Sequence, residues 1–182
     1  MSAQLDLDQI AASIHGYYVQ ANPRTVYAEF DKLPEFLKAD NREAAMRIGT
    51  VLGMAGLRLE PRDGQDWPDP DQAIIRQVIE ESIVLLAEAE HDGWMETRLR
   101  HGWQPAAQKD IDKREHHLLV PYDRLADQIK RKQSAAGAAI NGSGTPMTID
   151  EEVEAEKDKD RKSVRNYVDI IARTDYRIVQ EP

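Results

Sequence analysis

The sequence predicts a mostly helical α+β fold that is built from two related halves. Apolar residues recur at helical spacing over several long stretches, while β-prone runs are few and short. One motif also occurs twice, as IAASIHGYY at residues 10–18 and as LAEAEHDGW at residues 86–94. In each copy an aromatic residue follows a histidine by three positions, which indicates an internal repeat.

Composition restricts the class of protein. The 182 residues include 24 Lys and Arg against 33 Asp and Glu, which gives a formal net charge of −9. A phosphate backbone repels an acidic chain, so we expect no nucleic-acid polymer as a partner. The absence of cysteine excludes disulfides and thiolate catalysis and favours a reducing cytoplasm. No secretory signal and no apolar run of about 18 residues is apparent, so we expect no membrane partner.

In the first half, capping residues predict where the helices begin. Asp6 is predicted to cap a first helix, which should end at Asn22 because the residue before a proline disfavours the α region. The elements predicted after it are a short strand at 26–30, a one- or two-turn helix at 33–37, a helix capped by Asp40 and ended by Gly56, and an extended segment at 57–59.

The second half follows a turn-rich connector at residues 61–70, which holds Trp67. Asp71 is predicted to start one long helix that reaches Arg100, because apolar residues step at three and four along it. The elements predicted after it are a polar loop at 104–114, a strand at 118–122, a helix at 125–133, a flexible insertion loop at 134–146, a helix capped by Thr148, and a strand at 175–179.

Further blocks repeat in the same order as the motif. Residues 30–33 match 122–125, residues 40–42 match 159–161, and residues 55–59 match 174–178. The offset grows from 76 to 92 to 119, so the second copy would carry two insertions. We therefore predict repeat 1 at about 7–60 and repeat 2 at about 71–179.

The histidines do not predict a metal or catalytic centre. No pair among His91, His101, His116 and His117 has the i, i+4 spacing of a helical zinc site, so no metal is predicted. His15 and His91 hold one repeat position, which suits a buried histidine that bonds a backbone carbonyl. We find no catalytic constellation and no cofactor motif, and we predict a protein that is not an enzyme.

The second half resembles a known family. The residues that carry the resemblance are LAEAEHDGW at 86–94 with Arg98, Gly102-Trp103, LVPY at 119–122 with Leu125, and KDR at 159–161 with Val164-Arg165. Together they are similar to the ryanodine-receptor (RyR) repeat domain in its bacterial and phage form. Residues 33–42, LPEFLKADNR, are similar to the first repeat of such tandems.

The resemblance implies two pseudo-twofold-related repeats with short antiparallel strands, and a role in ligand sensing within nucleotide-signalling or defence systems. A repeat pair of this family can hold an adenine nucleotide between its halves. On this chain Tyr18 and Trp94, one per half, would sandwich the base, and Arg98 would meet a phosphate. The full set of predicted ligand-binding residues is Tyr18, Trp94, Arg98, His91, Trp103, Arg42 and Arg161.

Each candidate also has a structural alternative. Core packing would explain Trp94 and Trp103, and helix caps or ion pairs between the repeats would explain Arg42 and Arg161. The predicted function is a non-catalytic sensor of a nucleotide or nucleotide-derived signal. Its alternatives are a protein–protein accessory module, with a protein partner or a homodimer, and a small hydrolase that acts on nucleotides.

Overall fold

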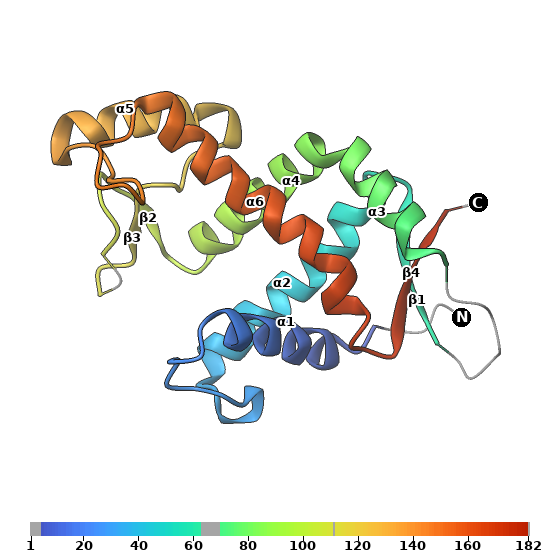
Figure 1. The fold of residues 1–182 in the computed structure, drawn as a ribbon. Helices are drawn as coiled ribbons and strands as arrows, with labels where there is room; N and C mark the ends of the chain where they lie inside the picture. Colours follow the sequence, from blue (N-terminus) through green and yellow to red (C-terminus); the bar gives the residue numbers. More distant parts are fainter. Residues whose placement is uncertain (1–4, 63–69, 111, 182) are drawn as a thin grey trace. The chain divides into compact units, whose positions relative to one another are not determined.

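The computed structural model describes residues 5–62, 70–110 and 112–181 (Figure 1). These residues form six α-helices and four short strands, which confirms the predicted mostly helical α+β fold. The chain divides into two compact units, and each is described here by itself. Unit 1 is Met1–Leu86 with Val164–Pro182, and unit 2 is Ala87–Ser163. None of the helices in the described ranges combines the length and apolar character that a membrane span requires.

Unit 1 contains helices from both ends of the chain and a two-stranded sheet. Its elements are α1 (Leu7–Ala21), the 3-10 helix η1 (Phe30–Lys32), α2 (Glu35–Gly53), β1 (Leu57–Pro61), α3 (Gln72–Glu81), the start of α4 (Ile83–Arg100), the end of α6 (Ile149–Ile171) and β4 (Tyr176–Gln180). Its core consists of fully buried aliphatic side chains, among them Ile10, Ile48, Leu52, Leu57 and Ile171.

Two of the predicted helix starts in unit 1 are confirmed by their caps. The Asp6 carboxylate accepts hydrogen bonds from the backbone N–H groups of Asp8 and Gln9, both at 3.1 Å. The Asp71 carboxylate accepts one from the N–H group of Ala73 at 2.8 Å. Each carboxylate satisfies N–H groups that the first turn of a helix leaves without a partner.

The β1–β4 sheet joins the middle of the chain to residues 176–180, and both strands were predicted as extended. The strands are antiparallel, and Leu59 lies opposite Ile178 at the centre of the register. Leu57 lies opposite Gln180 at one end, and Pro61 lies opposite Tyr176 at the other. Leu57, Tyr176 and Ile178 are buried, so one face of the sheet packs on the core of unit 1.

Two predictions for the first half are wrong. The segment 26–30 forms no strand, because it has no neighbour to pair with, and Phe30 instead begins η1. The short helix and the helix capped by Asp40 are one continuous helix, α2, which begins after Pro34. Asp40 lies inside α2, where the Nδ2 group of the next residue, Asn41, donates to the carbonyl of Leu37 at 2.8 Å. No residue in this stretch interrupts the helical backbone, so α2 runs on to Gly53.

Two predictions for the second half are also wrong. The long helix predicted from Asp71 to Arg100 is broken at Ser82, whose N–H group donates to the carbonyls of Val78 at 3.3 Å and Ile79 at 3.2 Å. The segment 118–122 forms no strand, and its last residue begins the 3-10 helix η2. Most of the predicted connector at 61–70, including Trp67, lies outside the described residues.

Unit 2 contains most of α4, the first part of α6 and the chain between them. Its remaining elements are β2 (Gln104–Pro105), β3 (Glu115–His116), η2 (Tyr122–Arg124) and α5 (Leu125–Ala136). A buried cluster of Ala87, Tyr122 and Leu125 forms the core, with Leu118 and Val120 packed against it.

Buried Glu152 holds the segment after α5 in place. The side chain of Glu152, on the first turn of α6, pairs with Lys132 and accepts from Gln133 Nε2 at 2.9 Å. It also accepts from the N–H group of Ala139 at 3.3 Å. The predicted capping box at the start of α6 is confirmed, because Thr148 and Glu151 exchange hydrogen bonds at 2.7 and 3.2 Å.

Candidate functional site

The predicted ligand-binding residues lie in both units. Unit 1 contains Tyr18 and Arg42, and unit 2 contains His91, Trp94, Arg98, Trp103 and Arg161. The predicted sandwich of a base between Tyr18 and Trp94 joins residues of both units and stays a prediction. The two groups are therefore described separately.

The two candidates of unit 1 differ in their contacts, because Tyr18 is largely exposed and Arg42 forms ion pairs. Tyr18, near the end of α1, is 53% exposed, and its ring stacks on that of His15 with 6.3 Å between the ring centroids. Arg42 forms ion pairs with the carboxylates of Asp8 and Glu35, and its Nη2 lies 3.2 Å from Oδ2 of Asp8. The hydrogen bond to Asp8, followed by that to Glu35, raises the pKa of Arg42. Arg42 thus makes ion pairs with residues of its own unit, whereas its structural alternative predicted ion pairs between the repeats.

His91 is buried and bonded through both ring nitrogens. It is 2% exposed, its Nε2 lies 2.9 Å from the carbonyl oxygen of Val120, and its Nδ1 lies 3.2 Å from Oδ2 of Asp160. Burial opposes a charge on the ring, but the hydrogen bonds to Asp160 and Val120 outweigh it and raise the pKa of His91. The contact with the Val120 carbonyl is the one that the repeat position predicts. His15 makes a similar contact in unit 1, with Nε2 at 3.1 Å from the carbonyl oxygen of Tyr27.

Aromatic rings gather around His116 in unit 2. The His116 ring meets Trp94 edge-on at 5.2 Å and Trp103 at 6.4 Å, and it stacks on His117 at 5.0 Å, all between ring centroids. The guanidinium carbon of Arg98 lies 4.9 Å from the centroid of Trp103. We call these five residues the aromatic cluster.

His116 and His117 were not predicted as members of the site. Parallel pairing of β2 with β3 sets Pro105 opposite His116, and so brings His116 next to the chain at Trp103. Two consecutive histidines after a polar loop are only a weak signal for such a site, and two-residue strands carry no recognisable pattern. In contrast, the structure brings the predicted Trp94, Arg98 and Trp103 together.

Positive charges act on His116 within the aromatic cluster. Burial, followed by the charges of His117, Lys109, Arg98 and Lys159, lowers the pKa of His116 to about 4. The ring is therefore neutral at pH 7. Its Nδ1 accepts from the N–H group of Leu118 at 3.1 Å, so Nε2 carries the proton.

Acid should weaken the fold through His116. Because the pKa is about 4 in the fold against 6.5 ordinarily, the unfolded chain binds the proton first as the pH falls from 6.5 to 4. Between pH 6.5 and pH 4, the free energy of unfolding of wild type should fall by on the order of 1 kcal/mol more than that of His116→Phe. This value allows for solvent screening. Urea unfolding of both proteins at several pH values measures the difference, and a constant difference would contradict the prediction.

Arg161 pairs along its own helix. Its Nη2 lies 2.8 Å from Oε2 of Glu154, and its Nε lies 3.5 Å from Oδ1 of Asp158. The hydrogen bond to Glu154 raises the pKa of Arg161 against the effect of burial. It is the neighbouring residue, Asp160, that contacts His91, through its Oδ2 atom. Arg161 therefore acts in an ion pair within α6, and Asp160, which was not among the predicted residues, holds the histidine.

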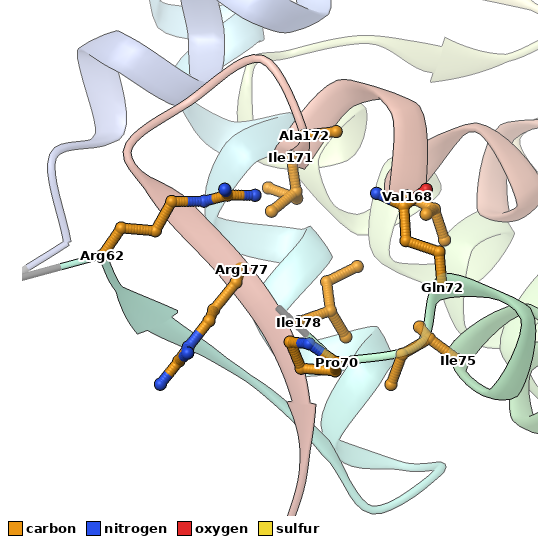
Figure 2. A pocket seen from close by; sticks show the side chains of 9 residues that line it. All are labelled: Arg62, Pro70, Gln72, Ile75, Val168, Ile171, Ala172, Arg177 and Ile178. Atoms are coloured by element: carbon orange, nitrogen blue, oxygen red, sulfur yellow. The ribbon is translucent and has the colours of Figure 1, made fainter. Parts of the chain in front are cut away.

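A small cavity in unit 1 is too confined for the predicted ligand. Figure 2 shows Arg62, Gln72 and Arg177 around it, together with apolar side chains such as Ile75 and Ile171. Its volume is about 30 Å³, room for about one water molecule, whereas ligand sites have about 300–1,000 Å³. Across the described ranges, no group of three His, Asp or Glu side chains is arranged to hold a metal ion.

Comparison with known families supports the resemblance seen in the sequence. Residues 68–139 match the family model described as the RyR domain. This range contains α3, α4, β2, β3, η2 and α5, and with them all five residues of the aromatic cluster. The segment 68–139 of this chain is thus similar to the RyR domain.

Proposed function

We propose that this chain is a non-catalytic binding module of two RyR repeats, and that it senses a nucleotide or a nucleotide-derived signal. The aromatic cluster carries the proposal, because Trp94, Trp103 and His116 offer flat rings beside the guanidinium of Arg98. Aromatic faces stack on bases, and guanidinium groups bind phosphates. A bacterial or phage origin, a cytoplasmic location and a role in defence signalling belong to the same proposal and rest on the family resemblance.

The surroundings of His15 and His91 support the tandem repeat. Each histidine ring meets the aromatic residue three positions later, at 6.3 Å for Tyr18 and 5.7 Å for Trp94. Each also meets the first residue of a 3-10 helix, Phe30 at 6.4 Å and Tyr122 at 5.7 Å. Two segments unrelated by a repeat would have no reason to build the same ring environment.

Burial at matched positions supports the repeat as well. When the two copies are aligned with the offsets of the predicted repeat, several buried residues of the first copy correspond to buried residues of the second. The matched buried pairs include Ile10 and Leu86, Ala11 and Ala87, Ala45 and Val164, Ile48 and Tyr167, and Leu52 and Ile171.

The register of the β1–β4 sheet is the third support. Leu59 and Ile178 are matched by the repeat, and they lie opposite one another at the centre of the sheet. Leu57 and Tyr176 are also matched, and they lie at equivalent positions on the two strands, two residues before the centre. If each residue of β1 is replaced by its matched residue of β4 and the reverse, the same pairs of residues lie opposite one another. This is expected for two related strands around a twofold axis.

The geometry of His91 favours a non-catalytic role over the hydrolase alternative. A general base needs an accessible lone pair on a ring nitrogen. Both nitrogens of His91 face oxygen atoms of the protein, and the ring is 2% exposed. This arrangement suits a residue that holds Asp160 and the chain at Val120 in position.

Nucleotide titration of Trp94 variants tests the proposal. With a panel of mono-, di- and cyclic nucleotides, we expect at least one to bind wild type in isothermal calorimetry. Loss of one stacking face costs about 1–3 kcal/mol, so Trp94→Ala should weaken binding by about 5- to 150-fold, and Trp94→Phe should weaken it less. Phe36→Ala, at an exposed apolar residue of unit 1, is a control that should change nothing.

Two results would decide against parts of the proposal. If no nucleotide binds at millimolar concentration, the nucleotide function is wrong. If Tyr18→Ala binds as wild type does while Trp94→Ala does not, the sandwich of a base between the two rings is wrong.

A further inference from the structure

The exposed face of α5 is hollowed at two neighbouring places. One hollow has a volume of about 310 Å³ and is lined by Val120, Pro121, Arg124, Asp127, Gln128 and Arg131. The other has a volume of about 600 Å³ and is lined by Asp127, Lys130, Arg131, Ser134 and Ala135. Asp127 and Arg131 line both, so the two hollows are neighbours along the helix, and we call them together the α5 groove.

The groove presents two cations that the protein itself does not neutralise. Lys130 and Arg131 are exposed, and within the described residues neither makes an ion pair. The next residue, Lys132, turns inward and pairs with buried Glu152. Arg124 adds a third cation at the other end of the groove, where it pairs with the carboxylates of Asp127 at 3.8 Å and Asp123 at 3.9 Å. The groove is thus locally basic on a chain whose net charge is −9.

The dimensions of the groove suit a short peptide. The 12 residues of α5 span roughly 18 Å at 1.5 Å per residue. An extended segment advances about 3.3 Å per residue, so five or six residues would lie along the helix. Apolar surface at both ends of the groove, from Val120 and Pro121 and from Ala135, can receive small apolar side chains.

The charge pattern distinguishes a peptide from a nucleic acid. A phosphate backbone carries closely spaced negative charges along its whole length. Such a backbone would run over the carboxylate of Asp127 at the middle of the groove. An acidic peptide can place a neutral residue there and its carboxylates at Lys130 and Arg131.

We propose that the α5 groove binds an acidic segment of a partner protein, about five or six residues long and extended, with carboxylates at Lys130 and Arg131. This surface is separate from the aromatic cluster, and the proposal goes beyond nucleotide sensing. It gives the chain a protein partner selected by charge and shape, and the two activities can succeed or fail independently.

Fluorescence anisotropy with a labelled probe tests the proposal. The probe is an acetylated hexapeptide of alternating Val and Glu, and its matched partner carries Gln in place of Glu. We expect wild type to bind the Glu peptide and not the Gln peptide. The double variant Lys130→Glu, Arg131→Glu should bind the Glu peptide at least about tenfold more weakly, because like charges would then face each other.

Two control variants separate the groove from general electrostatics. Lys162→Glu changes an exposed cation of α6 and should leave peptide binding within about twofold of wild type, after screening by salt. Ala135→Trp keeps every charge but fills the larger hollow, so it should weaken binding as the double variant does.

The opposite results would overturn the proposal. Equal binding of the two peptides, or an equal loss in Lys162→Glu, would show that the groove does not select an acidic segment. Tighter binding of a short DNA duplex than of the Glu peptide would show that the surface serves a nucleic acid instead.

Discussion

Replacement of Glu152 by alanine should lower the free energy of unfolding by about 3–5 kcal/mol, the range for breaking a buried ion pair. The Glu152 side chain is 3% exposed, and its partner Lys132 is 19% exposed, so the substitution leaves an ammonium group largely shielded from water. It also removes the acceptor for Gln133 Nε2 and for the N–H group of Ala139. Urea unfolding at pH 7 measures the loss.

Glu154→Ala is the matched control for this variant. Glu154 lies two residues further along α6, its side chain is 63% exposed, and it pairs with Arg161 at 2.8 Å. Because this carboxylate is exposed, whereas that of Glu152 is buried, the pair contributes less than about 1 kcal/mol. Equal effects of the two substitutions would contradict the role assigned to Glu152.

The contribution of Glu152 should also depend on pH. Burial would raise the pKa of Glu152, but the hydrogen bonds from Lys132, Gln133 and Ala139 outweigh it and lower the pKa below its usual value of 4.5. The stability that it adds is therefore complete above pH 4.5 and is lost as the pH falls through the lower pKa of the folded state.

Replacement of His91 by alanine should lower the free energy of unfolding by about 3–5 kcal/mol. The reason is again that one partner of a buried pair, here Asp160, loses the other. The variant loses the bonds to Asp160 and Val120 and the ring contact with Tyr122. Since the pKa of His91 is raised above 6.5, the stability from its charge is complete below pH 6.5 and is lost as the pH rises through the folded-state pKa. The difference between wild type and variant should thus be larger at about pH 5.5 than at about pH 9.

His15→Ala provides the comparison within the same chain. His15 has the carbonyl bond and the aromatic neighbours of His91, but Asn41 stands where the repeat places Asp160 in the second half. We expect a smaller loss of stability for His15→Ala than for His91→Ala. An equal loss in the two variants, or a His91→Ala effect that grows with pH, would contradict an ion pair at His91.

Features set by neighbouring residues were predictable from the sequence. Asp6, Asp71 and Thr148 cap helices because a cap requires only a side chain and the next few N–H groups. The same pattern at Asp40 predicted a helix start wrongly, since an uninterrupted backbone satisfies those N–H groups within α2. A capping pattern therefore predicts a helix start only where the preceding backbone is not already helical.

Features that depend on distant partners were not predictable. The β-prone segments 26–30 and 118–122 do not become strands, because a strand also needs a neighbour with free backbone groups. At the candidate site, the sequence motif identified Trp94, Arg98 and Trp103. It could not identify His116, which joins the tryptophans through the pairing of two-residue strands.

The β1–β4 sheet has a consequence for the order in which the chain folds during synthesis. Arg62 Nε donates to the carbonyl of Tyr176 across 114 residues of sequence, so a ribosome must synthesise the chain as far as β4 before the sheet can close. Unit 2 is continuous from Ala87 to Ser163 and can gather its core earlier. Until residues 176–180 emerge, the edge of β1 that pairs with β4 has no partner strand, so its backbone N–H and C=O groups stay open to pairing with other chains.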